Sequence, residues 1–390
     1  MPRSLKIILW LMFTLGFISG FAGLVFPNQS PLVESLPPDT YQSQRLHVFL
    51  FNLVGGGTTL LYFTEQKSKV SWRCSLYLLG SITFSLAAFF NQYLLAIILA
   101  VGLAVLVEFV RVRRYSFFPY DFFRNNILVA HKFHQAALLC LSLGLLIASF
   151  VMLNNHYLHI FYWPSLVLDD FFLGFSFPIS LMTFSVIFSL GRKDDEKHIR
   201  VLREVSFWVI NLGVIIFFIF IILQIDALQV AVAMLLFIDV LIVFFLFRYD
   251  SRKIEQENFL ISGILFLVIT SITGIMITLA ETYMPVQEPR AWALLLKIHT
   301  YLALYGWNLS GLTVIIRYNE FPLKLHDLEI ILTHWLVVAW LAPMGSLYTV
   351  FAVVALPGFG VLIWLILFSG THHDKHPGSD TLIDSLTPRF

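Results

Sequence analysis

The sequence predicts an all-α protein, a polytopic bundle of transmembrane helices. Hydrophobic residues make up 58% of the 390-residue chain and charged residues only 13%, whereas a soluble domain is nearer half apolar and a quarter charged. Apolar segments of about 20 residues, the length that crosses a bilayer, recur from one end of the chain to the other. Together these observations predict a multi-pass membrane protein.

Twelve apolar segments are expected to span the membrane, and the basic residues predict their direction. The segments are 5–26, 46–63, 72–90, 92–110, 131–152, 171–190, 204–223, 228–248, 258–281, 291–317, 327–345 and 348–369. If the N-terminus is cytoplasmic, all of the 25 lysines and arginines except Arg45, Arg290 and Lys297 fall on the cytoplasmic side. This bias is typical of membrane proteins. We therefore expect both termini in the cytoplasm and the protein in the cell inner (plasma) membrane.

The remaining composition limits the domain organisation and the chemistry. Residues 1–370 are expected to form a single transmembrane domain and residues 371–390 a flexible cytoplasmic tail. The segment 111–130 mixes basic and aromatic residues and is expected to lie at the cytoplasmic membrane surface. A net charge of +1 gives no indication of a nucleic-acid partner. The sequence contains no phosphate-binding loop, HExxH, paired CxxC or GxSxG motif, so ATP-driven and hydrolytic chemistry has no support.

The second segment contains the pattern from which the functional interpretation starts. Within 45–63, RLHVFLFNLVGGGTTLLYF, His47 is followed by Gly55, Gly56 and Gly57. On an α-helix Gly55 lies about 12 Å further along, and the first and third glycines flank the histidine face. The missing side chains would make room for a flat ligand such as a porphyrin, whose iron the imidazole would bind. They would suit a closely packed neighbouring helix equally well.

The tenth segment supplies a candidate partner for His47. His299 lies in its outer part and is followed seven residues later by Gly306. Two imidazoles at comparable depth on different helices are what a bis-histidine haem requires. We therefore predict haem b, with His47 and His299 as ligands of the haem iron and with Gly55 and Gly306 beside the ring. Another ligand or metal, or histidines hydrogen-bonded to neighbouring helices, are the alternatives.

Other ionisable residues inside the membrane are functional candidates because burying them is costly. His131 and His134 are spaced i,i+3 and share a helix face, which is compatible with one metal or a second haem. His334 is a candidate partner for His134. Interfacial histidines that meet lipid headgroups are the alternative for all three. Asp239, near mid-membrane, could serve a proton path or hydrogen-bond a neighbouring helix.

Two fragments carry a resemblance to a known family. Arg45-Leu46-His47, followed by an apolar run and three glycines, is similar to the second helix of the haem-copper oxidase catalytic subunit and its nitric oxide reductase branch. The fragment 299–307, HTYLALYGW, resembles the tenth helix of that family. The resemblance implies a twelve-span fold with both termini inside, in which the histidine of the second helix binds the low-spin haem.

The chain also departs from this family. The family has two histidines in the tenth helix, separated by one residue, and this chain has only His299. Either Lys297 replaces the high-spin ligand or Tyr301 replaces the low-spin ligand, and the spacing from Tyr301 to Gly306 favours the second alternative. Pairing His47 with His299 on one iron would then differ from the family. The sixth and seventh segments lack the histidines of the family's copper site, so copper is not expected. A second candidate relative is the NnrS family, which is similar to this chain in length and in number of spans.

The resemblance and the histidines together predict an integral membrane haem-binding protein without a recognisable copper site. Its expected role is respiratory electron transfer or nitric oxide- and oxygen-related metabolism, with a quinone or a cytochrome as candidate redox partner. The alternatives are a secondary transporter, with Asp239 and His134 in its pathway, and a non-catalytic membrane partner of another complex. Whether the protein is an enzyme is left open.

Overall fold

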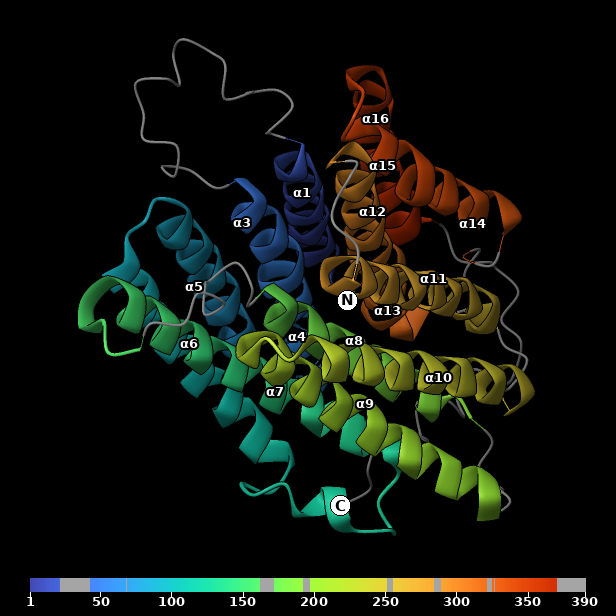
Figure 1. Cartoon of the computed structure of the whole chain (residues 1–390). Coiled ribbons are helices and arrows are strands. Elements are labelled where there is room, and N and C mark those ends of the chain that lie inside the picture. Colours follow the sequence, from blue (N-terminus) through green and yellow to red (C-terminus); the bar gives the residue numbers. More distant parts are fainter. Residues whose placement is uncertain are drawn as a thin grey trace. The chain divides into compact units, whose positions relative to one another are not determined.

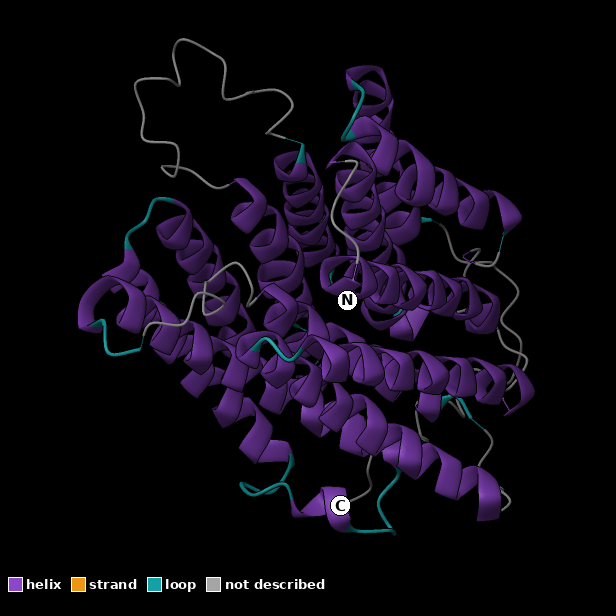
Figure 2. Ribbon diagram, in the orientation of Figure 1, coloured by secondary structure: helices purple, strands orange, loops and turns teal. Residues whose placement is uncertain are grey.

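The computed structural model describes residues 1–21, 43–67, 69–161, 172–191, 197–250, 255–283, 289–320, 325 and 327–369. These residues are predominantly helical (Figures 1 and 2). Each of the segments expected to span the membrane coincides with a helix. The predicted tail, 371–390, lies outside the described residues.

Most of the spans are single helices, and three are composites of consecutive helical pieces. The single helices are α1 (Arg3–Gly20), α5 (Trp72–Phe89), α6 (Tyr93–Arg114), α7 (Val129–Leu153), α8 (Phe172–Ser189), α9 (Lys197–Leu223), α10 (Asp226–Asp250), α11 (Glu255–Tyr283) and α16 (Thr349–Phe368). The composites are α3–η1–α4 (Ser43–Val48, Phe49–Gly56, Gly57–Glu65), α12–η5–α13 (Pro289–Tyr301, Leu302–Asn308, Leu309–Ile316) and α14–η8–α15 (Leu328–Trp335, Leu336–Leu341, Ala342–Gly345). Short 3-10 helices are η2 (Tyr120–Phe123) and η6 (Tyr318–Glu320), and a π-helix, η3 (Asn154–Leu158), directly continues α7.

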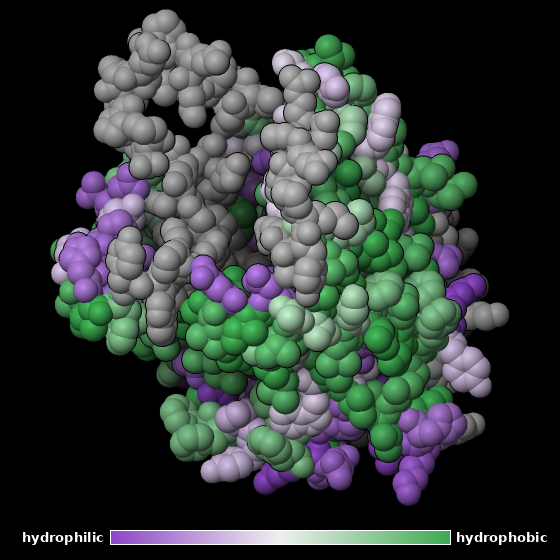
Figure 3. Space-filling model, viewed as in Figure 1, coloured by the Kyte–Doolittle hydropathy of each residue, from purple (hydrophilic) through white to green (hydrophobic). Residues whose placement is uncertain are grey.

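Within the part of the chain that the structure describes, nine helices are long and apolar enough to cross a membrane. The other three expected spans, α5, α8 and α12–η5–α13, are helical but are not among these nine. Large apolar side chains such as Ile215, Ile219 and Phe245 are exposed on α9 and α10, and apolar surface is extensive in Figure 3. Side chains of this kind are expected to face lipid. The chain is therefore a multi-span helical membrane protein.

The described helices group into two compact units. The first unit comprises Met1–Arg124, His134–Leu181 and Gly345–Ile363, and the second comprises Asn125–Phe133, Met182–Met344 and Trp364–Phe390. In the first unit, α1 packs against α16, where the rings of Phe17 and Phe359 stack with centroids 3.9 Å apart. In the second unit, Phe184 of α8 packs against Trp307 of η5 with centroids 5.2 Å apart.

The three composite spans share a local feature that is not evident from the sequence: each contains a π-helix. Their central pieces, η1, η5 and η8, are π-helices, which are wider than an α-helix and often occur at functional sites. Each begins two or three residues after a histidine, namely His47, His299 and His334. The histidine-bearing stretches of these three spans are therefore candidate functional sites.

Candidate functional site

His47 of α3 is held against α1 in the first unit. Its side chain is 5% exposed, and Nδ1 lies 2.9 Å from the main-chain oxygen of Gly16. Because a carbonyl only accepts hydrogen bonds, Nδ1 must carry the proton and donate it. This geometry makes Nε2 the ring nitrogen suited to bind a metal, as in most metal-ligating histidines.

Glycines of α1 allow this close approach to His47. A Cβ at Gly20 would lie 2.7 Å from Nδ1 of His47, and a Cβ at Gly16 would lie 3.2 Å from its main-chain oxygen. Any larger side chain at Gly20 would therefore displace the imidazole. The two glycines form a GxxxG pattern, the sequence signal for closely packed membrane helices, which could have identified α1 as the neighbour of the histidine helix.

The three consecutive glycines after His47 are each covered by a side chain from another helix of the first unit. A Cβ at Gly55 would collide with the ring of Phe13 in α1. At Gly56 it would collide with Ile179 of α8, and at Gly57 with Tyr77 of α5. The sequence was compatible with two roles for these glycines, room for a porphyrin or close packing of a neighbouring helix. The contacts in the structure are those of close helix packing. A porphyrin edge beside Gly55 would require the Phe13 ring to turn away.

His299 of α12 has the same kind of environment in the second unit. Its Nδ1 lies 3.0 Å from the main-chain oxygen of Thr270 and 3.2 Å from the hydroxyl of Thr273, both in α11. A Cβ at Gly274 would lie 3.1 Å from Cε1 of the ring, so a glycine again allows the imidazole to approach a helix backbone. Here too Nδ1 donates to a carbonyl, and Nε2 is the nitrogen suited to a metal.

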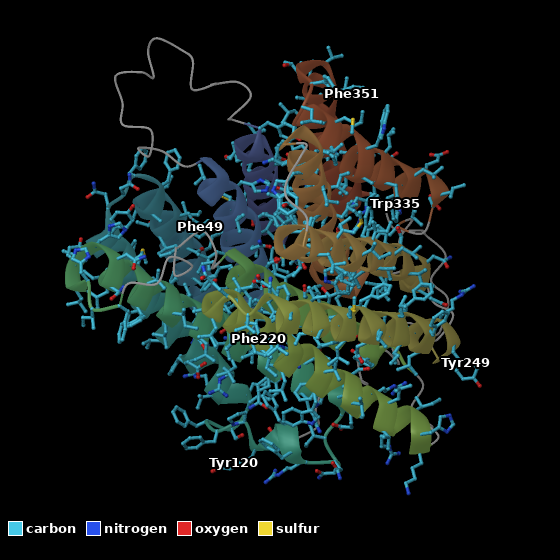
Figure 4. The ribbon with its side chains drawn as sticks, in the orientation of Figure 1. Phe49, Tyr120, Phe220, Tyr249, Trp335 and Phe351 are labelled. Carbon is cyan, nitrogen blue, oxygen red and sulfur yellow. The ribbon has the colours of Figure 1, made fainter. Side chains whose placement is uncertain are left out.

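The second glycine expected beside a haem, Gly306, is also covered by an aromatic ring. A Cβ there would lie 2.5 Å from ring atoms of Phe266 in α11. The Phe266 ring stacks on Trp335, which is labelled in Figure 4, with centroids 3.9 Å apart. Trp335, the last residue of α14, in turn donates its indole N–H to Ser262. Gly306 therefore allows η5 to pack closely on Phe266 of α11, and a porphyrin edge at this point would require the Phe266 ring to move.

His334 of α14 connects two composite spans of the second unit. Its side chain is fully buried, and Nε2 donates to the main-chain oxygen of Tyr305, inside the π-helix η5, over 2.6 Å. The ring lies between Phe266 and Phe259, with centroid distances of 4.8 and 6.1 Å. Within the described part of the chain, Nδ1 has no hydrogen-bond partner. Nε2 of His334 is therefore used in the hydrogen bond that joins α14 to η5.

His134 is hydrogen-bonded within the first unit in a way that explains its burial. Its Nε2 lies 2.8 Å from the hydroxyl of Thr64, and this hydroxyl donates to the main-chain oxygen of Leu60 over 2.7 Å. The hydroxyl must therefore accept from Nε2–H of His134. The ring also packs on Phe63 and on Tyr115, whose pKa burial raises to about 12. The hydrogen bond occupies the ring nitrogen most often used for metals.

The three further candidate metal ligands, His131, His134 and His334, are divided between the two units. His131 and His134 share the first turns of α7, as predicted, but His131 is only half-buried and belongs with the second unit. His334 belongs to the second unit and His134 to the first. The described residues contain no group of three or more histidine, cysteine or acidic side chains that could hold a metal ion.

Two charged residues inside spans are paired with groups that the sequence alone does not identify. Asp239 of α10 accepts a hydrogen bond from the hydroxyl of Ser206 in α9 over 2.9 Å. This contact fits the helix-packing alternative for Asp239. Lys132, which is fully buried, forms an ion pair with Glu204 at 2.7 Å in the second unit. Both partners lie more than 30 residues away in sequence, beyond the reach of any local pattern.

None of the protein-family models, curated proteins or solved structures compared with this chain matches it. The geometry of the described residues is thus the basis for a functional assignment. Its most specific feature is that His47 and His299 each donate Nδ1–H to a main-chain carbonyl beside a glycine of a neighbouring helix.

Proposed function

We propose that this protein is an integral membrane haem-binding protein, in which His47 and His299 are each a ligand of b-type haem iron. The supporting observation is that the two imidazoles are hydrogen-bonded in the same way, with Nδ1 atoms 2.9 and 3.0 Å from backbone oxygens. Histidines that ligate metals almost always donate their other ring N–H in this manner, which fixes the tautomer and raises the basicity of Nε2.

The residues around each histidine would orient it and exclude water. The carbonyl oxygens of Gly16 and Thr270 accept hydrogen bonds from the two imidazoles. The missing side chain at Gly20 allows the His47 ring to lie close to α1. A haem supplies one-electron transfer when it is bound. The proposed role is therefore respiratory electron transfer or nitric oxide- and oxygen-related metabolism.

The sequence supports the proposed haem role and the proposed membrane location. The resemblance to the haem-copper oxidase family supports a haem role, and the missing copper-site histidines argue against a copper centre. The distribution of basic residues supports cytoplasmic termini and an inner-membrane location. A quinone or a cytochrome in that membrane is the redox partner of this proposal.

The reduced-minus-oxidised absorption spectrum of the detergent-purified protein tests the proposal. The wild type, expressed with adequate haem supply, should show a b-type signal that is lost in His47→Ala and in His299→Ala. His134→Ala and His334→Ala are matched controls, because both histidines are buried and hydrogen-bonded through Nε2, and both variants should keep the signal. A wild type without haem, or a signal that survives both ligand substitutions, would overturn the proposal.

A further inference from the structure

The connection that follows α6 exposes four large aromatic side chains. We call residues 115–124 the interface loop. Phe117, Phe118, Tyr120 and Phe123 are between 59% and 74% exposed, and Tyr120 projects outward from η2 in Figure 4. Single exposed apolar residues are normal on a protein, but four within one short loop mark a surface that meets something other than water.

The buried side chain of Arg111 fixes the backbone of this loop. It is 2% exposed and forms an ion pair with Glu108 at 2.6 Å. Its two terminal nitrogens also donate to the main-chain oxygens of Ser116 and Phe117, over 3.0 and 2.8 Å. The aromatic side chains that follow are therefore held outward by a built backbone, so their exposure is a property of the fold of the first unit.

Two exposed arginines and an exposed apolar face of α6 lie next to the aromatic residues of the interface loop. Arg113 is exposed and lies over the ring of Phe109 at 4.4 Å, and the side chain of Arg124 is 63% exposed. Asp121, 3.6 Å from Arg124, is the acidic side chain that faces it. The same face of α6 carries a stripe of exposed apolar residues that leads to the loop: Leu94, Ile98, Val101, Val105 and Phe109. A bilayer would cover this stripe and the loop together.

We propose that the interface loop lies in the headgroup region of the membrane and binds anionic phospholipids. The aromatic side chains would enter the boundary between headgroups and acyl chains, where amphipathic segments with basic residues bind most strongly. The guanidinium groups of Arg113 and Arg124 would contact lipid phosphates, which attract basic residues near the surface. This proposal does not depend on haem binding.

The depth of the loop is measured with a nitroxide label on Phe118→Cys, in full-length protein that also carries Cys140→Ser. The second native cysteine, Cys74, is buried. In vesicles of phosphatidylcholine and phosphatidylglycerol, the label should be relaxed by oxygen, which dissolves in the bilayer, more than by a water-soluble nickel chelate. The opposite result would overturn the proposal. A label shielded from both reagents would indicate that a second copy of this chain covers the loop and would overturn it as well.

Lipid selectivity is measured by the association of spin-labelled phosphatidylglycerol relative to spin-labelled phosphatidylcholine. The wild type should prefer the anionic lipid, and the double variant Arg113→Gln/Arg124→Gln should lower this preference roughly two- to fivefold for each arginine removed. The matched control, Arg113→Lys/Arg124→Lys, keeps both charges and should keep the preference. Equal association of both lipids with the wild type, or an unchanged preference in the glutamine variant, would contradict the assignment.

Discussion

Replacing His334 with phenylalanine should destabilise the π-helix η5 while leaving the surrounding packing intact. The histidine ring is fully buried between Phe259 and Phe266, and a phenylalanine ring can take the same position. It cannot donate to the main-chain oxygen of Tyr305, which accepts from His334 at 2.6 Å. Leaving this buried oxygen without its donor costs about 1–3 kcal/mol.

Amide hydrogen exchange of residues 302–308, followed by mass spectrometry, measures this loss where it occurs. A cost of about 1–3 kcal/mol should speed exchange through local opening roughly 5- to 150-fold. His334→Gln is the matched control, because its side-chain amide can donate from a position near that of Nε2 and should restore much of the protection. Unchanged exchange in His334→Phe, or equally fast exchange in both variants, would refute the role of this hydrogen bond.

Two further substitutions test the packing of each unit separately. Gly57→Ala should lower thermal stability by about 1–3 kcal/mol, because the new methyl group collides with Tyr77, whereas Gly102→Ala, which meets no atom within 4 Å, should be neutral or stabilising in the same melting assay. Lys132→Met should destabilise by about 3 kcal/mol, the low end for a broken buried ion pair because the Glu204 side chain is 21% exposed, and adding Glu204→Gln should recover part of the loss in denaturant titrations. A harmless Gly57→Ala or Lys132→Met would contradict the contact in question.

Hydropathy was sufficient to locate the helices, because the bilayer imposes length and composition on every span. The predicted segment 46–63 corresponds to a continuous helix over 43–65, and 291–317 corresponds to 289–316. For the first segment, predicted over 5–26, α1 covers Arg3–Gly20, and residues 22–26 lie outside the described part of the chain. The π-helices could not be predicted, because a short π-helical stretch within an almost wholly apolar segment leaves no distinct pattern in the sequence.

The candidate histidines were identified from the sequence, but their partners were not. Thr64 lies 70 residues before His134, and Tyr305 lies 29 residues before His334. Which ring nitrogen donates depends on such distant contacts, so the orientation of His47 and His299 was also inaccessible. The one available signal was the GxxxG pattern of α1, which could have indicated a close neighbour for His47.

The electron paramagnetic resonance spectrum of the oxidised, purified protein, combined with its haem content, tests the central claim most directly. The proposal predicts a low-spin signal of histidine-ligated haem in the purified protein. His47→Ala and His299→Ala should each abolish this signal or convert it to high spin, and His134→Ala should leave it unchanged. Absence of haem from the wild type, or a low-spin signal that persists in both ligand variants, would contradict the assignment of His47 and His299.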